Sequence, residues 1–390
     1  MEDLGDLAAK SRDADAWRPP MRFGLIDEAC VPHGVSFYQR YREMIDEAVL
    51  AEEMGFDFWG SSEHHHLVDI GISSPEVFFA AVAQHTSRIR LRHMVRLALS
   101  FNHPLRIAEQ TATLDLVSNG RVDLGLGRSN QEIQLDAFEV DPGDTREQMM
   151  ESLEVIMKAF SGESFTHKGK NWTIETPVHL TPRPLQTPHP PIFLSATSET
   201  MHKRTGELGL GLLSWDKYMG WDRAEKHARL YKEAIAEAPD QVSPLRNDNL
   251  SFLVIPAFCA ETENEAREKG APIALEFIQM IVKVFPSLAN RSSDYDYMRE
   301  FAELEKYQND IDFFLENSPG LMVGTPDHFV KQIRRLHDIG YDEVILRIDG
   351  AMEHDDHMRA IKMIGEEVIP EVKNPLNVVR SGLFPKGALP

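Results

Sequence analysis

Cysteine and basic residues are both scarce in this chain of 390 residues. Its two cysteines, Cys30 and Cys259, exclude a disulfide framework and a four-cysteine zinc site. Lysine and arginine number 41 against 62 aspartates and glutamates, which gives a formal net charge of −21. Because so negative a surface repels a polyphosphate, we expect no nucleic-acid partner.

Long apolar runs are missing as well. Residues 1–20 are polar and charged, without the apolar core of a signal peptide, and no apolar run approaches membrane-spanning length. We therefore expect a cytoplasmic protein with no membrane association. Hydrophobic residues make up 42% and charged residues 26%, which is ordinary for a globular protein with a sizeable core.

A repeated junction divides the chain into β/α units. A helical pattern ends, a glycine follows and a short apolar strand begins, at Gly55, Gly120, Gly209 and Gly340. Glycine readily adopts the left-handed conformation that ends a helix. Because eight strands alternate with amphipathic helices, we predict an α/β fold, a closed (β/α)8 TIM barrel. The predicted strands are 22–26, 56–60, 89–99, 122–126, 191–195, 210–213, 252–258 and 343–348.

Two stretches depart from the repeat within a barrel domain of residues 21–370, which has tails at 1–20 and 371–390. Residues 166–190 are rich in proline and histidine and predict a long loop with a hairpin. Residues 269–319 form an insertion of mixed helical character at a strand end. Such an insertion is either a lid over the site or scaffold without a catalytic role.

Polar residues follow the second predicted strand, at the end of the barrel where active sites lie. They are Glu63, His64, His65 and His66. Zinc ligation, hydrogen-bonded histidines at a strand end and general acid–base catalysis all remain open. No second cluster with ligand spacing is evident, so we favour acid–base chemistry and expect no metal.

A second group of polar residues begins the helix after the fifth strand. Thr197, Ser198 and Thr200 stand where backbone N–H groups and the helix dipole attract an anion, and Arg128 after the fourth strand could add a charged contact. The alternative is an ordinary helix cap. A phosphate here also requires the side chain of Glu199 to turn outward.

In this order, the motifs resemble the luciferase-like flavin-dependent monooxygenase family, and within it the alpha chain of bacterial luciferase, over residues 21–370. The matching text is Gly55-Phe56-Asp57 with Glu63-His64-His65, Asn102-His103-Pro104-Leu105-Arg106, Gly120-Arg121 with Gly127-Arg128, Leu213-Ser214-Trp215 and Val323-Gly324-Thr325-Pro326. Gly127 stands where the light-emitting luciferase carries a cysteine, so light emission is not inferred.

The resemblance implies a two-component monooxygenase that receives reduced FMN from a separate flavin reductase. With O2 it would oxygenate a small organic substrate through a flavin C4a-(hydro)peroxide. His64 would support that chemistry, with Glu63 as its structural neighbour. The implied flavin contacts are Arg128, Thr197, Ser198 and Thr200 at the phosphate, and Ser214 and Trp215 near the ring. Arg96 is a further implied contact. The Val95–Arg96 bond lies near a peptide bond that is cis in some relatives.

Two other functions remain open on the same barrel. One is an F420-dependent oxidoreductase, although such relatives tend to carry aspartate where Glu63 stands. The other is a non-catalytic flavin-binding partner subunit. Residues 75–83 are apolar nearly all round the helix, so we also expect a homodimer, or a heterodimer with a related chain, that buries this helix.

Overall fold

The computed structural model describes residues 19–32, 34–216, 218, 220–348, 350 and 352–374. The predicted tails, 1–20 and 371–390, lie mostly outside these described residues. Helix α14, Ile369–Lys373, continues past the expected domain boundary at residue 370.

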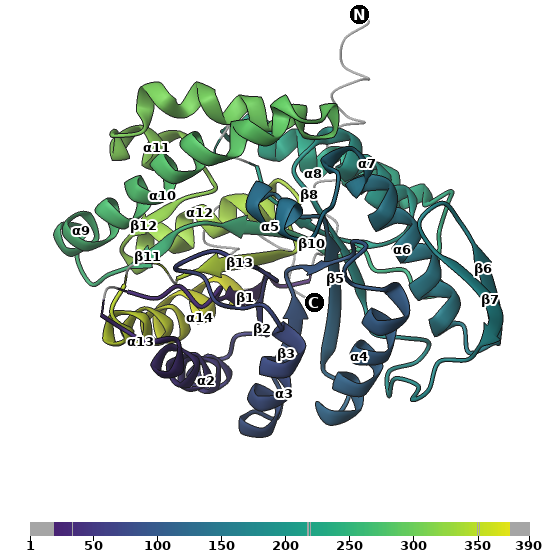
Figure 1. The fold of residues 1–390 in the computed structure, drawn as a ribbon. Helices are drawn as coiled ribbons and strands as arrows, with labels where there is room; N and C mark the ends of the chain where they lie inside the picture. The colour runs from purple at the N-terminus through teal and green to yellow at the C-terminus, as the bar shows by residue number, and fades with distance from the viewer. Residues whose placement is uncertain are drawn as a thin grey trace, which may run out of the picture.

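Eight parallel strands close into a barrel (Figure 1). The ring runs β1–β2–β3–β5–β8–β9–β10–β13 and returns to β1, because β3 pairs with β5 as well as with β2. The predicted (β/α)8 barrel is confirmed. The strands are β1 Arg22–Ile26, β2 Phe58–Ser61, β3 Arg90–His93, β5 Val122–Gly127, β8 Ile192–Ala196, β9 Gly211–Ser214, β10 Leu250–Val254 and β13 Glu343–Arg347.

Helices surround the ring and place their apolar faces on it. In the helix after β12, Phe329, Ile333 and Leu336 are buried at helical spacing. The four glycines of the repeated junction have φ between +71° and +119°, which confirms them as left-handed helix ends. The outer helices are α2 Phe37–Glu53, α3 Pro75–His85, α4 Pro104–Val117, α6 Thr145–Phe160, α7 Glu199–Glu207, α8 Trp221–Glu237, α12 Pro326–Asp338 and α13 His354–Met363.

Two predicted strands are each interrupted. Segment 89–99 forms β3 and a short β4, Arg96–Leu97. The cis bond between them joins Met94 to Val95, directly before the Val95–Arg96 bond near which the resemblance implied one. Segment 252–258 divides into β10 and β11, Ala257–Cys259, at Pro256, which has no N–H to continue the ladder.

The proline- and histidine-rich stretch contains the predicted hairpin. Strands β6, Phe165–Lys168, and β7, Thr173–Val178, pair antiparallel outside the barrel, at the right of Figure 1. His167 fixes the hairpin to α6, because its Nε2 lies 3.0 Å from a carboxylate oxygen of Glu151.

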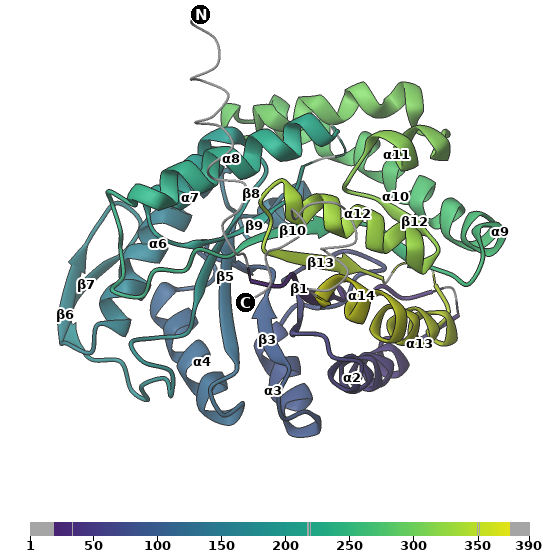
Figure 2. The same cartoon turned by 180° about the vertical axis from the view of Figure 1, so that it is seen from behind.

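The insertion covers the carboxyl end of the barrel and carries its own apolar cluster (green in Figures 1 and 2). It leaves the barrel after β11 and returns through β12, Met322–Gly324, which pairs with β11. Its elements are α9 Glu263–Glu265, the π-helical turn η2 Ala266–Gly270, α10 Ala271–Val284, the 3-10 segments η3 Phe285–Asn290 and η4 Ser293–Tyr307, and α11 Ile311–Asn317.

One helix of this insertion corrects the expectation that no apolar run approaches membrane-spanning length. The helical run Glu263–Asn290 contains an 18-residue window of mean hydropathy 1.4, enough by length and composition to cross a membrane. A third of that window (33%) is buried within the chain. Here the apolar residues of α10 serve instead to cover the barrel, and Phe277 and Met280 line the cavity beneath.

A buried ionic layer fills the opposite, amino-terminal end of the barrel. Arg92 is fully buried and pairs with Asp123 of β5 at 2.9 Å and with Glu343 of β13. Its guanidinium lies between the rings of Phe58 and Phe193, 3.7 and 4.1 Å from their centroids. This packed layer fills the barrel interior at the amino-terminal ends of the strands, opposite the insertion.

Candidate active site

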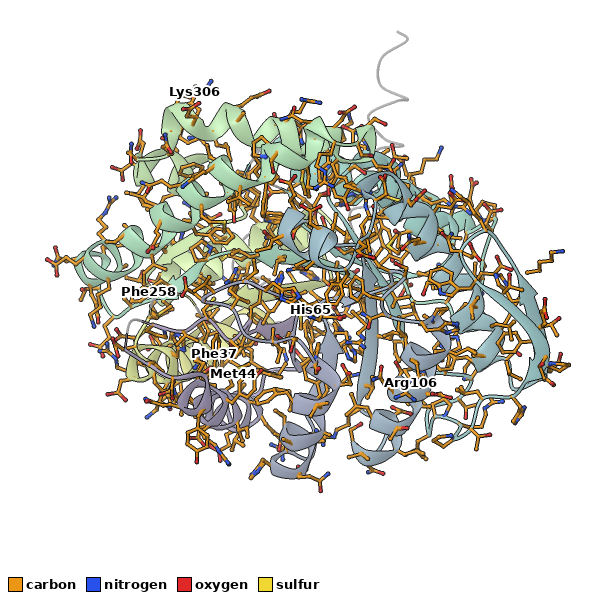
Figure 3. All side chains as sticks on the ribbon, in the orientation of Figure 1. Phe37, Met44, His65, Arg106, Phe258 and Lys306 are labelled. Atoms are coloured by element: carbon orange, nitrogen blue, oxygen red, sulfur yellow. The ribbon has the colours of Figure 1, made fainter. Side chains whose placement is uncertain are left out.

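A cavity of about 640 Å3 lies between the carboxyl ends of the strands and the insertion. It collects side chains from residues that are far apart in the sequence. Figure 3 labels His65, the chain neighbour of the lining residue His64, near the middle of the view. Six of the predicted site residues line the cavity: Glu63, His64, Arg128, Thr197, Ser198 and Trp215.

His64 has a partner on each ring nitrogen. Its Nδ1 lies 3.0 Å from Nε2 of Gln134, and its Nε2 lies 3.2 Å from Oε1 of Glu28. The Ser129 hydroxyl donates to Oε1 of Gln134 at 3.0 Å. This contact fixes which end of the amide is the oxygen and leaves the nitrogen facing His64. The amide therefore donates to Nδ1, and Nε2–H donates to the carboxylate of Glu28. The ring is held in one orientation at the cavity wall.

Glu28 is the partner that we did not predict. It lies two residues past the end of β1, is 6% exposed, and lies 2.9 Å from a guanidinium nitrogen of Arg347. Burial alone would raise the pKa of Glu28, but Arg347 and the hydrogen-bonded His64 together lower it well below its usual range. Glu28 is therefore an anion that joins Arg347 to His64. The other guanidinium nitrogen of Arg347 lies 2.9 Å from Sγ of Cys30.

Glu63 anchors the loop rather than standing free in the cavity. One carboxylate oxygen accepts from Leu97 N at 2.8 Å, and the other lies 2.8 Å from both His65 Nε2 and Asn102 Nδ2. Burial by itself would raise the pKa of Glu63. The hydrogen bonds and the charge of Arg96 together lower it by more than burial raises it, so the net shift of the pKa is downward. This arrangement agrees with the expected role of structural neighbour to His64.

Arg96 lies outside the cavity lining, contrary to its expected flavin contact. Its guanidinium lies 3.2 Å from Glu63 and 3.0 Å from Glu76 of α3, behind the wall of the cavity. The cis bond at Met94–Val95 adjoins the Val95–Arg96 bond near which the resemblance implied one, and both of its residues line the cavity. Arg96 thus reaches the cavity only through the carboxylate of Glu63.

The predicted phosphate residues divide at the start of α7. Thr197 and Ser198 line the cavity, and the Ser198 hydroxyl caps the helix by accepting from Met201 N at 3.4 Å. Thr200 is exposed and faces a neighbouring hollow instead, because it already lies in the first turn of the helix. Glu199 turns outward to Lys226 at 2.8 Å, as a phosphate beside it would require.

Arg128 lines the cavity opposite these hydroxyls, but its guanidinium also contacts the insertion. It donates to the backbone oxygen of Asp294 at 2.6 Å and stacks on Tyr295, 4.3 Å from the ring centroid. The Asp294 carboxylate lies 3.5 Å from Arg128 and 3.3 Å from Arg146. Two guanidinium groups therefore meet one carboxylate, which leaves an excess of positive charge at this end.

Ser214 and Trp215 face opposite sides of their segment, as successive strand residues do. Trp215 lines the cavity, as predicted, and packs against Phe301 with ring centroids 5.3 Å apart. Ser214, the last residue of β9, is fully buried, and its hydroxyl lies 2.7 Å from Nε2 of His202 in α7. Ser214 is therefore not placed at the cavity.

Among the described residues, no three His, Cys, Asp or Glu side chains converge in a way that could hold a metal ion. The histidines after β2 diverge, since His64 and His65 have different carboxylate partners, Glu28 and Glu63.

Comparison with known proteins places this barrel in a family. The model of the luciferase-like monooxygenases matches residues 21–343. The chain belongs to the luciferase-like monooxygenase family. It is 27% identical to limonene 1,2-monooxygenase of Rhodococcus erythropolis over 334 residues, which are 83% of this chain and 80% of that relative.

Solved structures of this family share the same barrel. Monooxygenase RslO1 of Streptomyces bottropensis is 27% identical, with a TM-score of 0.74 over 90% of this chain and 99% of that one. The oxygenating constituent of 3,6-diketocamphane monooxygenase of Pseudomonas putida, solved with FMN, has a TM-score of 0.69 at 24% identity, over 90% and 99% of the chains. An F420-dependent glucose-6-phosphate dehydrogenase of Microbacterium testaceum, 24% identical, is also a relative.

Proposed function

We propose that this luciferase-like protein is the oxygenase component of a two-component monooxygenase, which takes reduced FMN from a separate flavin reductase and uses O2. The observation that carries the proposal is one cavity with a cationic, hydroxyl-rich end and a histidine held on both ring nitrogens. The monooxygenase relatives support the reaction class, and the FMN-bound relative supports the cofactor.

The donor set of the cavity suits FMN. Arg128, Thr197 and Ser198 are the residues that would hold the phosphate, since guanidinium, hydroxyl groups and a helix N-terminus all favour an anion. Apolar lining from Val95, Leu213 and other strand-end residues suits a flat aromatic ring. When bound, reduced FMN supplies the electrons that activate oxygen.

The residues of the chain then perform three tasks. His64 exchanges a proton at the cavity wall, Glu28 orients its ring, and the insertion keeps water away from the reacting atoms. Exclusion of water matters because a reduced flavin exposed to air and water yields hydrogen peroxide instead of product. We assign the insertion as the lid of this site.

The cofactor can be tested directly on the full-length protein. Photoreduced FMN is mixed with it anaerobically, and then air is admitted while the return of oxidised-flavin absorbance is followed. We expect tight binding of reduced FMN and a reoxidation slower than that of free FMN. Binding of reduced F420 in preference to reduced FMN would instead support the deazaflavin reductase, and FMN binding with unchanged reoxidation would support a non-catalytic flavin-binding subunit.

We propose further that the protein is a cytoplasmic homodimer. Much of the apolar surface of α3 is used within its own chain, since Phe78, Phe79 and Val82 are buried. Val77 remains 68% exposed on the outer face of that helix. This residual apolar face is what supports a subunit contact.

A further inference from the structure

The end of the cavity away from Arg128 is apolar. In the ring of eight strands, β13, which carries Arg347, lies directly opposite β5, which leads to Arg128. Around Arg347 the lining comes from the segments after β1 and β2 and from α10. We call this region the α10 lobe and define it by Val31, Ile70, Ile273, Phe277 and Met280.

The cation at this lobe is already neutralised within the chain. Arg347 is 6% exposed, and its guanidinium lies 2.9 Å from Glu28. The ring of Phe277 covers it, with 5.3 Å between the guanidinium carbon and the ring centroid. Among the described residues that line this lobe, an anionic substrate would therefore meet no positive charge that is not already paired within the chain.

The carboxylates at the lobe do not favour a cation either. Glu28 already faces Arg347 and His64, and the exposed Asp69 and Glu276 lie at the solvent edge of the lining. Burying a charged group without a new partner costs several kcal/mol, whereas apolar contact gains about 25 cal/mol per Å2. Both terms favour a neutral ligand with a large hydrocarbon surface.

We propose that the α10 lobe binds an uncharged substrate that is mainly hydrocarbon and the size of a substituted ring, and that Phe277 and Met280 determine this specificity. The proposal rests on the proposed function for the reaction, but its tests measure binding alone. A flavin held by Arg128, Thr197 and Ser198 and a substrate held by the lobe would occupy opposite ends of one cavity, with His64 in its wall.

Two matched probes distinguish the charge classes: 4-tert-butylcyclohexanone and 4-tert-butylcyclohexanecarboxylate, which share ring and substituent. Calorimetric titration of each into the full-length protein at pH 7.5 is expected to give at least about tenfold tighter binding of the ketone, the equivalent of 1.4 kcal/mol. Carboxylate binding as tight as ketone binding, or no ketone binding, overturns the proposal.

Variants of α10 locate the binding. Phe277→Ala should weaken ketone binding about fivefold or more, while Lys283→Ala, an exposed residue on the same helix, should leave it unchanged. Met280→Lys should reverse the preference, because it supplies the cation that the lobe lacks. Ketone affinity unaltered in both Phe277→Ala and Met280→Lys would overturn the assignment of the lobe. The flavin reoxidation test uses neither probe, so the two proposals fail separately.

Discussion

His64 is the residue on which the proposed chemistry depends most. Because general acid–base catalysis contributes about a hundredfold to ten-thousandfold to a rate, His64→Ala should reduce the product formed per reduced FMN by about a hundredfold or more. FMN affinity should change little, since the proposed phosphate residues stand elsewhere in the cavity. Product yield and FMN dissociation constant are measured together.

The exposed His85→Ala variant is the control, because it also removes an imidazole but far from the cavity lining. An unchanged product yield in His64→Ala would remove this histidine from the mechanism.

At this scale the sequence predicted the groups that follow strands but not their partners. His64 and Arg128 come within three residues of the end of a strand, so their place at the barrel mouth follows from the fold. Glu28 comes two residues after a strand, and that position was a usable signal. Gln134 gave no such signal, because it stands within helix α5, Glu132–Ala137, and meets His64 only through tertiary packing.

Asp294 joins an element of the insertion to the proposed phosphate residues. Its carboxylate pairs with Arg128, a charge that an FMN phosphate would also use, and with Arg146 outside the cavity lining. Partly exposed ion pairs contribute about 0.2–1 kcal/mol, so Asp294→Asn should tighten FMN binding up to about fivefold. The check is fluorescence titration of FMN at low salt.

Asp296→Asn is the matched control for that titration. Asp296 lies in the same 3-10 segment, is exposed and pairs with Arg299 at 3.3 Å. If both variants, or neither, shift the FMN dissociation constant, competition between Asp294 and the phosphate is refuted.

Glu52 holds the turn that leads into β3. Its carboxylate accepts from the consecutive backbone amides of Ser87, Arg88 and Ile89, at 2.9, 2.5 and 2.8 Å. Burial would raise the pKa of Glu52, but these hydrogen bonds lower it from 4.5 to about 2. A carboxyl group whose pKa is lowered in the folded protein stabilises the fold at pH values above its pKa in the unfolded chain. This contribution is lost as the pH falls from about 4.5 toward about 2.

Glu52→Gln should therefore reduce the free energy of unfolding by about 1–3 kcal/mol at pH 7, with a smaller deficit near pH 3. Denaturant unfolding at both pH values measures this difference. Glu53→Gln, its exposed neighbour on the same helix, should behave like the natural protein at both. A deficit that does not shrink at low pH would exclude the ionised carboxylate as its cause.

Helices and strands were predictable from the sequence where apolar residues recur at a regular spacing. They were less predictable where tertiary contacts determine where an element begins or ends. Glycine ends and apolar stripes located the barrel units, including the helix around Phe329. The interruptions at Val95 and Pro256 were missed, because an apolar run alone does not show where a strand stops pairing. The membrane-length apolar run of α10 was missed because interspersed Glu276 and Lys283 conceal it in the sequence.

Five of the nine large apolar side chains that are exposed among the described residues lie on three neighbouring helices. They are Phe37 and Tyr38 on α2, Val77 on α3, and Leu116 and Val117 on α4. These three helices lie side by side along the lower edge of Figure 1. A two-fold axis through such a face would bury the same side chains in both subunits, which is the commonest arrangement of homodimers.

Val77 lies at the centre of that face, so a charge there should prevent assembly. Burying two unpaired carboxylates in an interface costs several kcal/mol, and Val77→Glu should therefore be monomeric at micromolar concentration where the natural protein is dimeric. Light scattering after size-exclusion chromatography gives the mass directly. Val242→Glu places the same charge at an exposed valine outside these helices and should remain dimeric. A natural protein that elutes as a monomer, or a Val77→Glu dimer, would contradict the α3 interface.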